Sequence, residues 1–263
     1  MVAGAFVRIE EKKNMNWSVK FDKFFSTMEN EIFQQKLLEG FVNTVQVAVL
    51  GLIIGIIIGS VIAVIKVAPK YKLIYRILDK ICSVYIAIFR GTPIVVQLLL
   101  AYYVVLPSLQ VKGVDSLVVG IAVFGMNSGA YVSEIMRGGL NSVDHGQMEA
   151  GRAVGLSYGT TMIKIVIPQA IKNILPTLGN EFITLIKETS VLSFIAVNDL
   201  YKILIDEIGG KNYEMMVPAL VLAFIYIILV LMITMLVKIL ENIFARSDRK
   251  RNDQSKKGGV ANA

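Results

Sequence analysis

Long apolar blocks are the feature of this 263-residue sequence that most constrains its fold. Four blocks carry at most one charged residue each, and they span residues 41–65, 81–106, 116–133 and 215–237. Each approaches or exceeds the roughly 20 apolar residues that cross a bilayer as a helix. A fifth block, 173–197, is as long but carries Glu181, Lys187 and Glu188. Because a helix satisfies its own backbone hydrogen bonds in lipid, the sequence predicts an all-α integral membrane protein with about five transmembrane helices.

The positive charges are unevenly distributed between the loops. Lys and Arg gather after the blocks 41–65, 116–133 and 215–237, whereas the loops after the other two blocks carry only Lys112, Lys202 and Lys211. The positive-inside rule then predicts a multi-pass protein of the cell membrane with its N-terminus outside and its C-terminus in the cytoplasm. This sorting accounts for the net charge of +7 without a nucleic-acid partner. Residues 1–40 are the discordant segment, with six positive and six negative side chains on the predicted outer side.

Composition divides the chain into three predicted parts. Residues 1–40 form a polar segment, partly amphipathic around its phenylalanines, residues 41–245 form the transmembrane domain, and residues 246–263 form a charged, Gly/Ala-rich cytoplasmic tail that we expect to be disordered. The single cysteine and single histidine, Cys82 and His145, allow neither an intrachain disulfide nor a Cys/His cluster. We therefore expect no metal site and no cofactor.

Small residues and one proline mark particular points within the blocks. Gly51, Gly55 and Gly59 fall on one helix face, which favours close packing within the chain, with a dimer seam as the alternative. Pro93 is expected to kink or break the second span, since it lacks a backbone donor. The third span is dense in small and polar residues, which indicates a face buried in protein rather than in lipid.

A short helix is predicted in the loop that follows the third block. Asp144 is a good N-cap with Gln147 three residues later, and Gly155 suits the left-handed position after a helix. Most residues of its second half are small and apolar (Met148, Ala150, Gly151, Ala153 and Val154), with Glu149 and Arg152 added. Such a helix fits a groove of another protein. It equally fits the membrane surface, and spacing alone leaves both open.

The order of residues in this loop resembles a known signature. Glu149-Ala150-Gly151 is followed after three residues by Gly155, and after nine more by Ile165-Val166-Ile167-Pro168. This resembles the EAA motif of ATP-binding-cassette (ABC) importer permeases, with Gly151 in place of a second alanine and Ile167 in place of leucine. The stretches 89–103, 131–157 and 178–200 resemble the polar amino-acid branch of that family, of the histidine/glutamine type. The resemblance covers roughly residues 38–245.

The resemblance implies a fold, a mechanism and partners. It implies the type I ABC importer permease fold, in which a cytoplasmic coupling helix of the loop 141–165 docks on a separate ATPase subunit through Glu149, Ala150, Gly151 and Gly155. It also implies an ATPase dimer, an extracytoplasmic substrate-binding protein and a second permease chain, identical or homologous. The chain has no G-x-x-x-x-G-K-[ST] phosphate loop, so we expect it not to be an enzyme itself.

Polar residues within the spans are the candidates for a substrate path or a gate. Helical spacing places five on one stripe of the fifth block, namely Asn180, Glu181, Thr184, Lys187 and Glu188. Arg90 and Gln97 lie seven residues apart on the second span and are expected to align. Charges of both signs suit an amino acid, but internal ion pairs, such as Arg90 with Glu181, are the alternative reading.

Three functions compete on these observations. The first is a permease subunit that imports a polar amino acid by alternating access, driven by the ATPase. The second is an ion-coupled secondary transporter, which Glu134, Glu181 and Glu188 would serve, although an odd number of spans without an inverted repeat opposes it. The third is a membrane scaffold, which the costly intramembrane charges oppose. The acidic loop 199–214 is predicted outside, where the binding protein would dock, and most of its residues are expected to be simply solvated.

Overall fold

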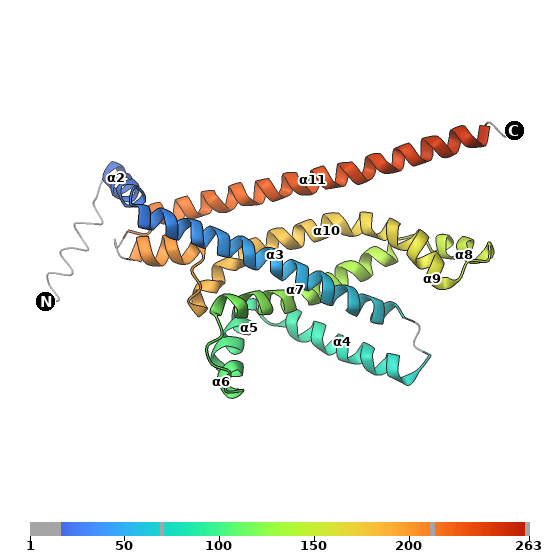
Figure 1. Ribbon diagram of the computed structural model, residues 1–263, viewed down its shortest axis with the longest axis horizontal. Helices are drawn as coiled ribbons and strands as arrows, with labels where there is room; N and C mark the ends of the chain where they lie inside the picture. Colours follow the sequence, from blue (N-terminus) through green and yellow to red (C-terminus); the bar gives the residue numbers. More distant parts are fainter. Residues whose placement is uncertain (1–16, 69–70, 211–213, 261–263) are drawn as a thin grey trace. The chain divides into compact units, whose positions relative to one another are not determined.

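The structure is a computed structural model that describes residues 17–68, 71–210 and 214–260, with side chains described up to Ile243. These residues form helices and no strand. The α-helices (Figure 1) are α2 (Trp17–Met28), α3 (Glu31–Val67), α4 (Leu73–Gly91), α5 (Ile94–Leu100), α6 (Leu106–Ser108), α7 (Ser116–Asn141), α8 (His145–Ala153), α9 (Tyr158–Thr161), α10 (Ile167–Glu188) and α11 (Met216–Val260). The π-helices η1 (Ala101–Val105), η2 (Met162–Val166) and η4 (Lys202–Gly210) and the 3₁₀ helix η3 (Thr189–Ile195) lie between them.

Three of the described helices are long and apolar enough to cross a membrane: α3, α7 and residues 216–243 of α11. Helix α4 and residues 94–108 together are also apolar enough, and they make a fourth if this bent pair is one broken span rather than a re-entrant loop. The predicted all-α membrane fold is confirmed. The block predicted as a fifth span corresponds to α10 followed by η3. It is not among these candidates, because α10 carries several polar and charged residues.

The second span is broken at Pro93, as the sequence predicts. Helix α4 ends at Gly91, and Thr92 has an extended backbone with φ −124° and ψ 144°. The Thr92 hydroxyl donates to the carbonyl of Ile88 over 2.8 Å, which occupies one carbonyl of the last turn. Because Pro93 cannot donate a backbone hydrogen bond, a new helix starts only at Ile94.

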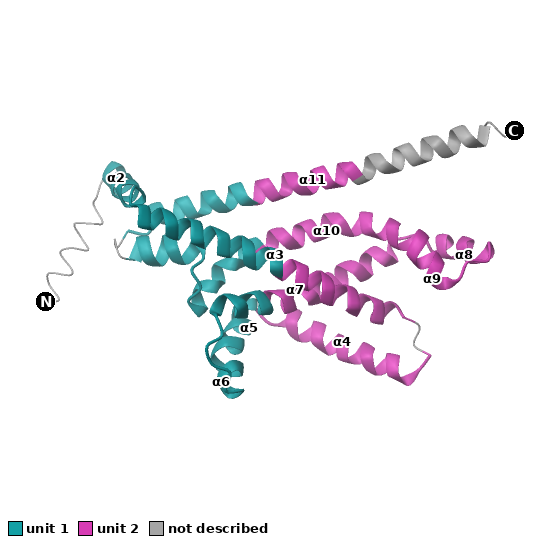
Figure 2. Cartoon of the chain, in the orientation of Figure 1, with its two compact units in different colours: residues 1–50, 94–123, 186–229 teal, residues 51–93, 124–185, 230–263 magenta. Residues whose placement is uncertain are grey.

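Two compact units divide the chain across its helices (Figure 2). Unit 1 comprises residues 1–50, 94–123 and 186–229, and unit 2 comprises residues 51–93, 124–185 and 230–263. The three-part division expected from composition stays a prediction, since residues 1–16 and 261–263 lie outside the described part. Helix α11 continues through residues 246–260, where composition indicates a disordered tail, and no side chain of that stretch is described.

Unit 2 is built on a close contact between α3 and α7. A Cβ atom added at Gly55 would lie 2.6 Å from the Ser128 hydroxyl oxygen, and one added at Gly59 would lie 2.7 Å from Val132. In return, a Cβ atom at Gly129 would lie 2.7 Å from Ile58. Glycines of each helix thus receive larger residues of the other, which is typical of tightly packed membrane helices. The predicted packing within the chain is confirmed.

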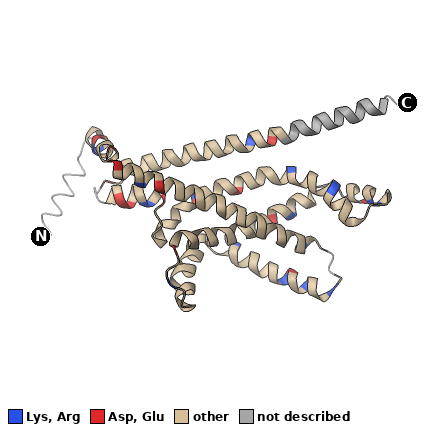
Figure 3. Cartoon of the chain, viewed as in Figure 1, with Lys and Arg blue, Asp and Glu red and all other residues tan. Residues whose placement is uncertain are grey.

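Unit 1 joins the first turns of α3 to the segment that follows η3. Gly40 approaches the backbone of Asp199 so closely that a Cβ atom would lie 3.0 Å from its carbonyl. The Asn43 side chain donates to the carbonyl of Asn198 over 2.8 Å, and the Leu200 amide donates to the hydroxyl oxygen of Thr44 over 3.4 Å. Charged residues lie toward the two ends of α3, and its middle carries none (Figure 3).

Candidate functional site

Helix α8, in the loop between α7 and α10, is capped at both ends. At its start, the Asp144 carboxylate accepts the Gly146 amide over 2.8 Å. At its end, Gly155 has φ +86°, and the amides of Gly155 and Leu156 donate to the carbonyls of Arg152 and Gly151. This pair of bonds is the Schellman arrangement. The predicted short helix, its Asp144 cap and its Gly155 stop are confirmed.

The side chain of Gln147 has a different role from the one its spacing suggests. Its carbonyl oxygen accepts a 3.2 Å hydrogen bond from Gln169, near the start of α10. A capping box would instead require this side chain to turn back to the Asp144 amide. Gln147 therefore ties the start of α8 to α10.

The inner face of α8 sits on small and apolar neighbours. Gly151 is buried, and a Cβ atom there would lie 2.4 Å from the Thr161 methyl carbon and 2.9 Å from its hydroxyl oxygen. Met148 packs against a cluster made by Val143, Val166, Ala170 and Ile174. A glycine at 151, where the EAA motif has alanine, thus matches the close approach of Thr161.

The outer face of α8 carries small and charged side chains. Glu149, Ala150, Arg152 and Ala153 are exposed, and Val154, just after the helix, is 77% exposed. The exposed valine and alanines offer a small apolar contact surface, and Glu149 and Arg152 on the same helix add one charge of each sign. Such a surface lets another backbone approach closely.

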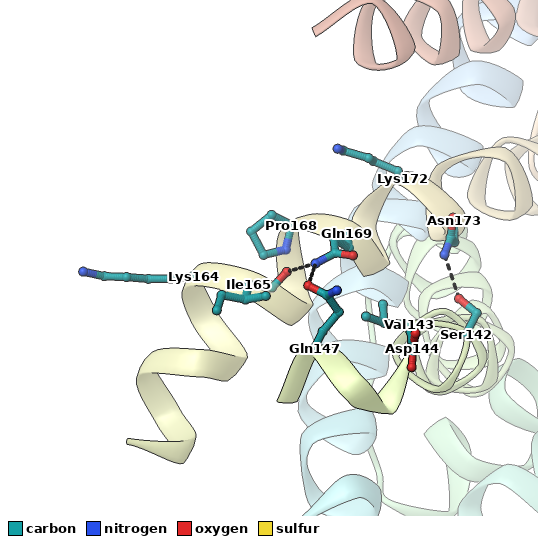
Figure 4. Close-up of a pocket in the computed structure, with 10 residues that line it drawn as sticks. All are labelled: Ser142, Val143, Asp144, Gln147, Lys164, Ile165, Pro168, Gln169, Lys172 and Asn173. Carbon is teal, nitrogen blue, oxygen red and sulfur yellow. Dashed lines mark hydrogen bonds between the residues drawn. The ribbon is translucent and has the colours of Figure 1, made fainter. Parts of the chain in front are cut away.

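A polar groove of about 520 Å³ lies between the start of α8 and the start of α10 (Figure 4). Its walls are tied by two hydrogen bonds, Gln169 to Gln147 and Asn173 to Ser142 over 2.8 Å. Its lining residues are Ser142, Val143, Asp144, Gln147, Lys164, Ile165, Pro168, Gln169, Lys172 and Asn173. Figure 4 shows the side chains of Lys164 and Lys172 extending away from the two glutamines.

Arg90 belongs to a cluster of charges in unit 2 that sequence reasoning missed. Glu134 of α7 lies 3.8 Å from an Arg90 guanidinium nitrogen and 2.7 Å from one of Arg137. The Arg90 guanidinium also lies 5.3 Å from the ring centre of Tyr131. The spacing of Tyr131, Glu134 and Arg137, three apart on one helix, was the available signal. The proposed pairing of Arg90 with Glu181 is replaced by this contact with Glu134.

Glu181 has a different environment from the rest of the predicted stripe. Its side chain is buried, and Ser128 of α7 donates to its carboxylate over 2.8 Å. Ser128 is the residue that faces Gly55, so the close α3–α7 contact fixes this donor. Asn180, Thr184 and Lys187 are exposed, whereas Glu188 is partly buried. The stripe on α10 thus has an exposed edge and a buried edge.

The expected alignment of Arg90 with Gln97 is wrong. Arg90 lies in the last turn of α4, and Gln97 lies in α5, with the break at residues 92–93 between them. A seven-residue spacing aligns two side chains only along one continuous helix. The two residues also belong to different compact units, Arg90 to unit 2 and Gln97 to unit 1.

Residues 51–247 match the family described as the binding-protein-dependent transport system inner membrane component. The chain belongs to this family. The match includes α8, the groove beside it and the Arg90–Glu134–Arg137 cluster, and it confirms the resemblance found in the sequence. The ion-coupled alternative finds no support among the relatives.

Two curated members of this family are similar to most of the chain. An arginine transport system permease protein of Bacillus subtilis is 36% identical over 81% of this chain and 94% of its own length. A putative glutamine transport system permease protein of Rickettsia prowazekii is 37% identical over 78% of this chain and 91% of its own length.

A solved structure shares both fold and sequence. The crystal structure of an amino acid ABC transporter with histidines matches with a TM-score of 0.74 and 35% identity, over 83% of this chain and 97% of that one. The fold expected for a type I ABC importer permease is therefore confirmed. As a member of an inner membrane component family with apolar helices, the chain is a multi-pass membrane protein.

Proposed function

We propose that this chain is the transmembrane permease subunit of an ABC importer that carries a polar amino acid across the cell membrane, driven by a separate ATPase. The observation that carries the proposal is α8, a helix capped at both ends that directs Glu149 and Ala150 outward. It lies at the position of the EAA motif in a chain of the binding-protein-dependent family. The two relatives named for arginine and glutamine support the substrate class.

The proposed role of α8 is to transmit motion of the ATPase to the spans. Gly151 against Thr161 and Met148 on its apolar cluster join α8 to the helices that follow, and Gln147 adds a polar tie to α10. A displacement of the outer face would therefore pass to α10, which carries the polar stripe. Glu149, Ala150, Gly151 and Gly155 are the proposed coupling residues. Of these, Gly151 supports the helix from its inner side.

The proposed substrate path uses groups within the spans. Asn180, Thr184 and Lys187 are exposed on α10, and Arg90 keeps 43% of its side chain exposed despite its contact with Glu134. Donors and a cation suit the carboxylate of an amino acid. Glu181, Glu188 and Gln97 complete the proposed path or gate. Glu181 is proposed as part of the gate because its buried carboxylate accepts from Ser128 of α7 and so links α10 to that helix.

The proposed assembly contains partners that the family name implies. A second permease chain is proposed in the same membrane, an ATPase dimer on the cytoplasmic side against α8, and a substrate-binding protein on the outer side. The sorting of Lys and Arg supports this orientation, with the N-terminus outside and the C-terminus in the cytoplasm.

Copurification tests the coupling role directly. The tagged full chain and Glu149→Lys would be purified in mild detergent from the same host, with ATP hydrolysis and amino-acid uptake measured. We expect the wild type to retain an ATPase subunit. Glu149→Lys should weaken binding of that subunit at least about tenfold, which corresponds to about 1.4 kcal/mol of binding free energy. Lys112→Glu is the matched control, a charge reversal on an exposed loop far along the chain from α8, and it should retain the subunit.

Two outcomes would contradict the proposal. Full retention and uptake by a well-expressed Glu149→Lys chain would exclude docking through this face of α8. Wild type that holds no ATPase, yet transports in vesicles under an ion gradient alone, would exclude the importer and make the carboxylates of the spans the centre of the mechanism.

A further inference from the structure

Helix α2 carries a stripe of aromatic rings that the permease function does not use. Trp17, Phe21 and Phe25 recur every four residues and cover about 80° of the helix circumference. Neighbouring rings lie 6.0 and 6.3 Å apart in stacked orientation. Their residues are 50%, 37% and 57% exposed. Helix α2 precedes residues 51–247, so this stripe lies outside the part that matches the family.

The adjacent face of α2 is fixed to unit 1. Phe24 is buried, and Lys20 forms an ion pair of 3.1 Å with Glu214 in which both side chains are mostly buried. The Lys20 ammonium also lies 5.7 Å from the Trp17 ring centre. These contacts set the rotation of α2 about its axis. The aromatic stripe therefore lies next to the protein-facing side of α2 and stays exposed.

The turn between α2 and α3 is equally well defined. Asn30 caps α3 by accepting the Ile32 amide over 2.9 Å, and the Gln34 side chain donates to the carbonyl of Met28 over 3.0 Å. Only Glu29 and Asn30 separate the two helices. Helix α2 is thus anchored at its C-terminal end as well as along one face.

The depth of α2 along the spans follows from its neighbours. Lys20, Lys23 and Phe24 line a small hollow together with Ile208, Glu214 and Pro218. Pro218 lies in the first turn of α11, within the uncharged stretch 215–237 that is long enough to cross a bilayer. Helix α2 therefore packs level with one end of an apolar span.

The surface beside α2 is apolar and exposed, as expected of a surface that faces lipid. Only 17% of the most apolar stretch of α11 and 33% of that of α3 is buried, and their mean hydropathies are 3.1 and 3.0. On α3 the exposed apolar side chains begin with Ile32, Leu38 and Phe41. The aromatic stripe of α2 continues this surface at the end of the spans.

We propose that α2 is an interfacial helix that inserts Trp17, Phe21 and Phe25 into the headgroup boundary of the bilayer at this end of unit 1. The polar face next to the stripe supports this partner, since it carries Ser18, Asp22 and Ser26 for the aqueous side. An amphipathic helix of this kind lies in the plane of the interface with its apolar face in lipid. Tryptophan is the residue most suited to that depth, because its ring is apolar and its N–H is polar.

Trp17 is the only tryptophan of the chain, so its fluorescence reports on this helix alone. The full chain would be reconstituted in vesicles of phosphatidylcholine and phosphatidylglycerol with lipids brominated near the headgroup or near the chain ends. The Trp17→Phe chain supplies the background from any copurifying protein. Ile57→Trp in that background marks the deep position, because Ile57 is 60% exposed in the middle of α3. Acrylamide reports access from water.

We expect shallow bromines to remove roughly half of the Trp17 emission, deep bromines to remove less, and acrylamide to have little effect. Phe21→Asp should abolish most of the lipid quenching. Val19→Asp is the matched control, since Val19 is also exposed and apolar but lies on the polar face, and it should leave the quenching unchanged.

Each other result overturns the proposal. Strong acrylamide quenching without bromine quenching would place the stripe in water. Emission that neither quencher reaches would place it against a second copy or another protein. Deep bromines acting more strongly than shallow ones would exclude an interfacial depth, and equal losses in Phe21→Asp and Val19→Asp would exclude a face-specific contact with lipid.

Discussion

The two surface helices of this permease, α8 and α2, are held in opposite ways. Helix α8 is fixed by contacts between residues close in sequence, such as Gly151 with Thr161 and Gln147 with Gln169. Helix α2 and the start of α3 are fixed by contacts that join distant parts of unit 1, such as Lys20 with Glu214 and Lys36 with Glu207.

This difference separates a part suited to move from a part suited to stay in place. A helix whose contacts are with residues nearby in sequence can move together with them as a rigid body. Helix α8 can therefore transmit a displacement to the helices that follow it. Helix α2 is tied through Lys20 to Glu214, and Lys36 of the adjoining α3 is tied to Glu207, 171 positions away along the chain, so a shift of this region breaks both contacts. The small and charged outer face of α8 suits a protein partner, whereas the aromatic stripe of α2 suits lipid.

The aspartates that cap helices in the two regions show the same contrast. Asp144 at the start of α8 is exposed, while Asp199 is fully buried and accepts the amides of Tyr201 and Lys202 over 3.2 and 3.0 Å. Asp199 lies outside every candidate span. Burial raises the pKa of its carboxyl from 3.8 to about 7, and the two backbone amides offset this only in part.

The largest expected effect is therefore a pH dependence of the free energy of unfolding, caused by Asp199 in unit 1. The folded pKa of Asp199 is above the unfolded one, so its contribution to stability is fully present below about pH 4 and is lost as the pH rises through about 7. The slope is at most about 1.4 kcal/mol per pH unit. Thermal unfolding of the detergent-purified chain across this window should show a fall that Asp199→Asn lacks. Asp144→Asn is the matched control at the exposed cap, and an unchanged slope in Asp199→Asn would contradict the assignment.

The second prediction concerns the contact of α8 with the residues that follow it, where Gly151 packs against Thr161. Gly151→Ala should destabilise the α8 contact by about 1–3 kcal/mol, because the added methyl meets the Thr161 side chain, which is β-branched and has little freedom to move. Uptake should fall with it.

Thr161→Ser in the same chain should restore most of the loss. It removes the nearest methyl carbon and keeps the hydroxyl that donates to the Ser157 carbonyl over 3.0 Å. Melting temperatures of the two single variants and the double variant complete the cycle. Additive effects would show that the two side chains do not meet.

Much of this architecture could be predicted from local rules. The uncharged blocks, the break at Pro93, the Asp144 cap and the positive φ of Gly155 each depend on a few neighbouring residues. The packing of Gly51, Gly55 and Gly59 within the chain followed because small residues on one helix face require a close partner.

What could not be predicted depends on contacts between distant residues. Asp199 was expected to be solvated with the rest of its acidic loop, but Gly40 and Thr44 of α3 approach it and exclude water. Arg90 was expected to align with Gln97, whereas the helix break directs it to Glu134. In both places the sequence shows a charged residue, and only the fold shows its partner.

The smallest predicted effect tests whether α8 needs its stop signal rather than space around it. Apart from its chain neighbours, no atom of the described residues lies within 4 Å of a Cβ atom added at Gly155, so Gly155→Ala should cost about 1 kcal/mol through its φ of +86° alone. Gly155→Asn should cost less, since asparagine tolerates this conformation. Gly159→Ala is the matched control four residues on, because a Cβ atom there also meets nothing while the backbone is helical, and it should be neutral or slightly stabilising. ATPase retention and melting temperature should therefore rank Gly159→Ala, Gly155→Asn and Gly155→Ala in falling order. Equal values for all three would mean that the end of α8 is fixed by its partner and not by its own backbone.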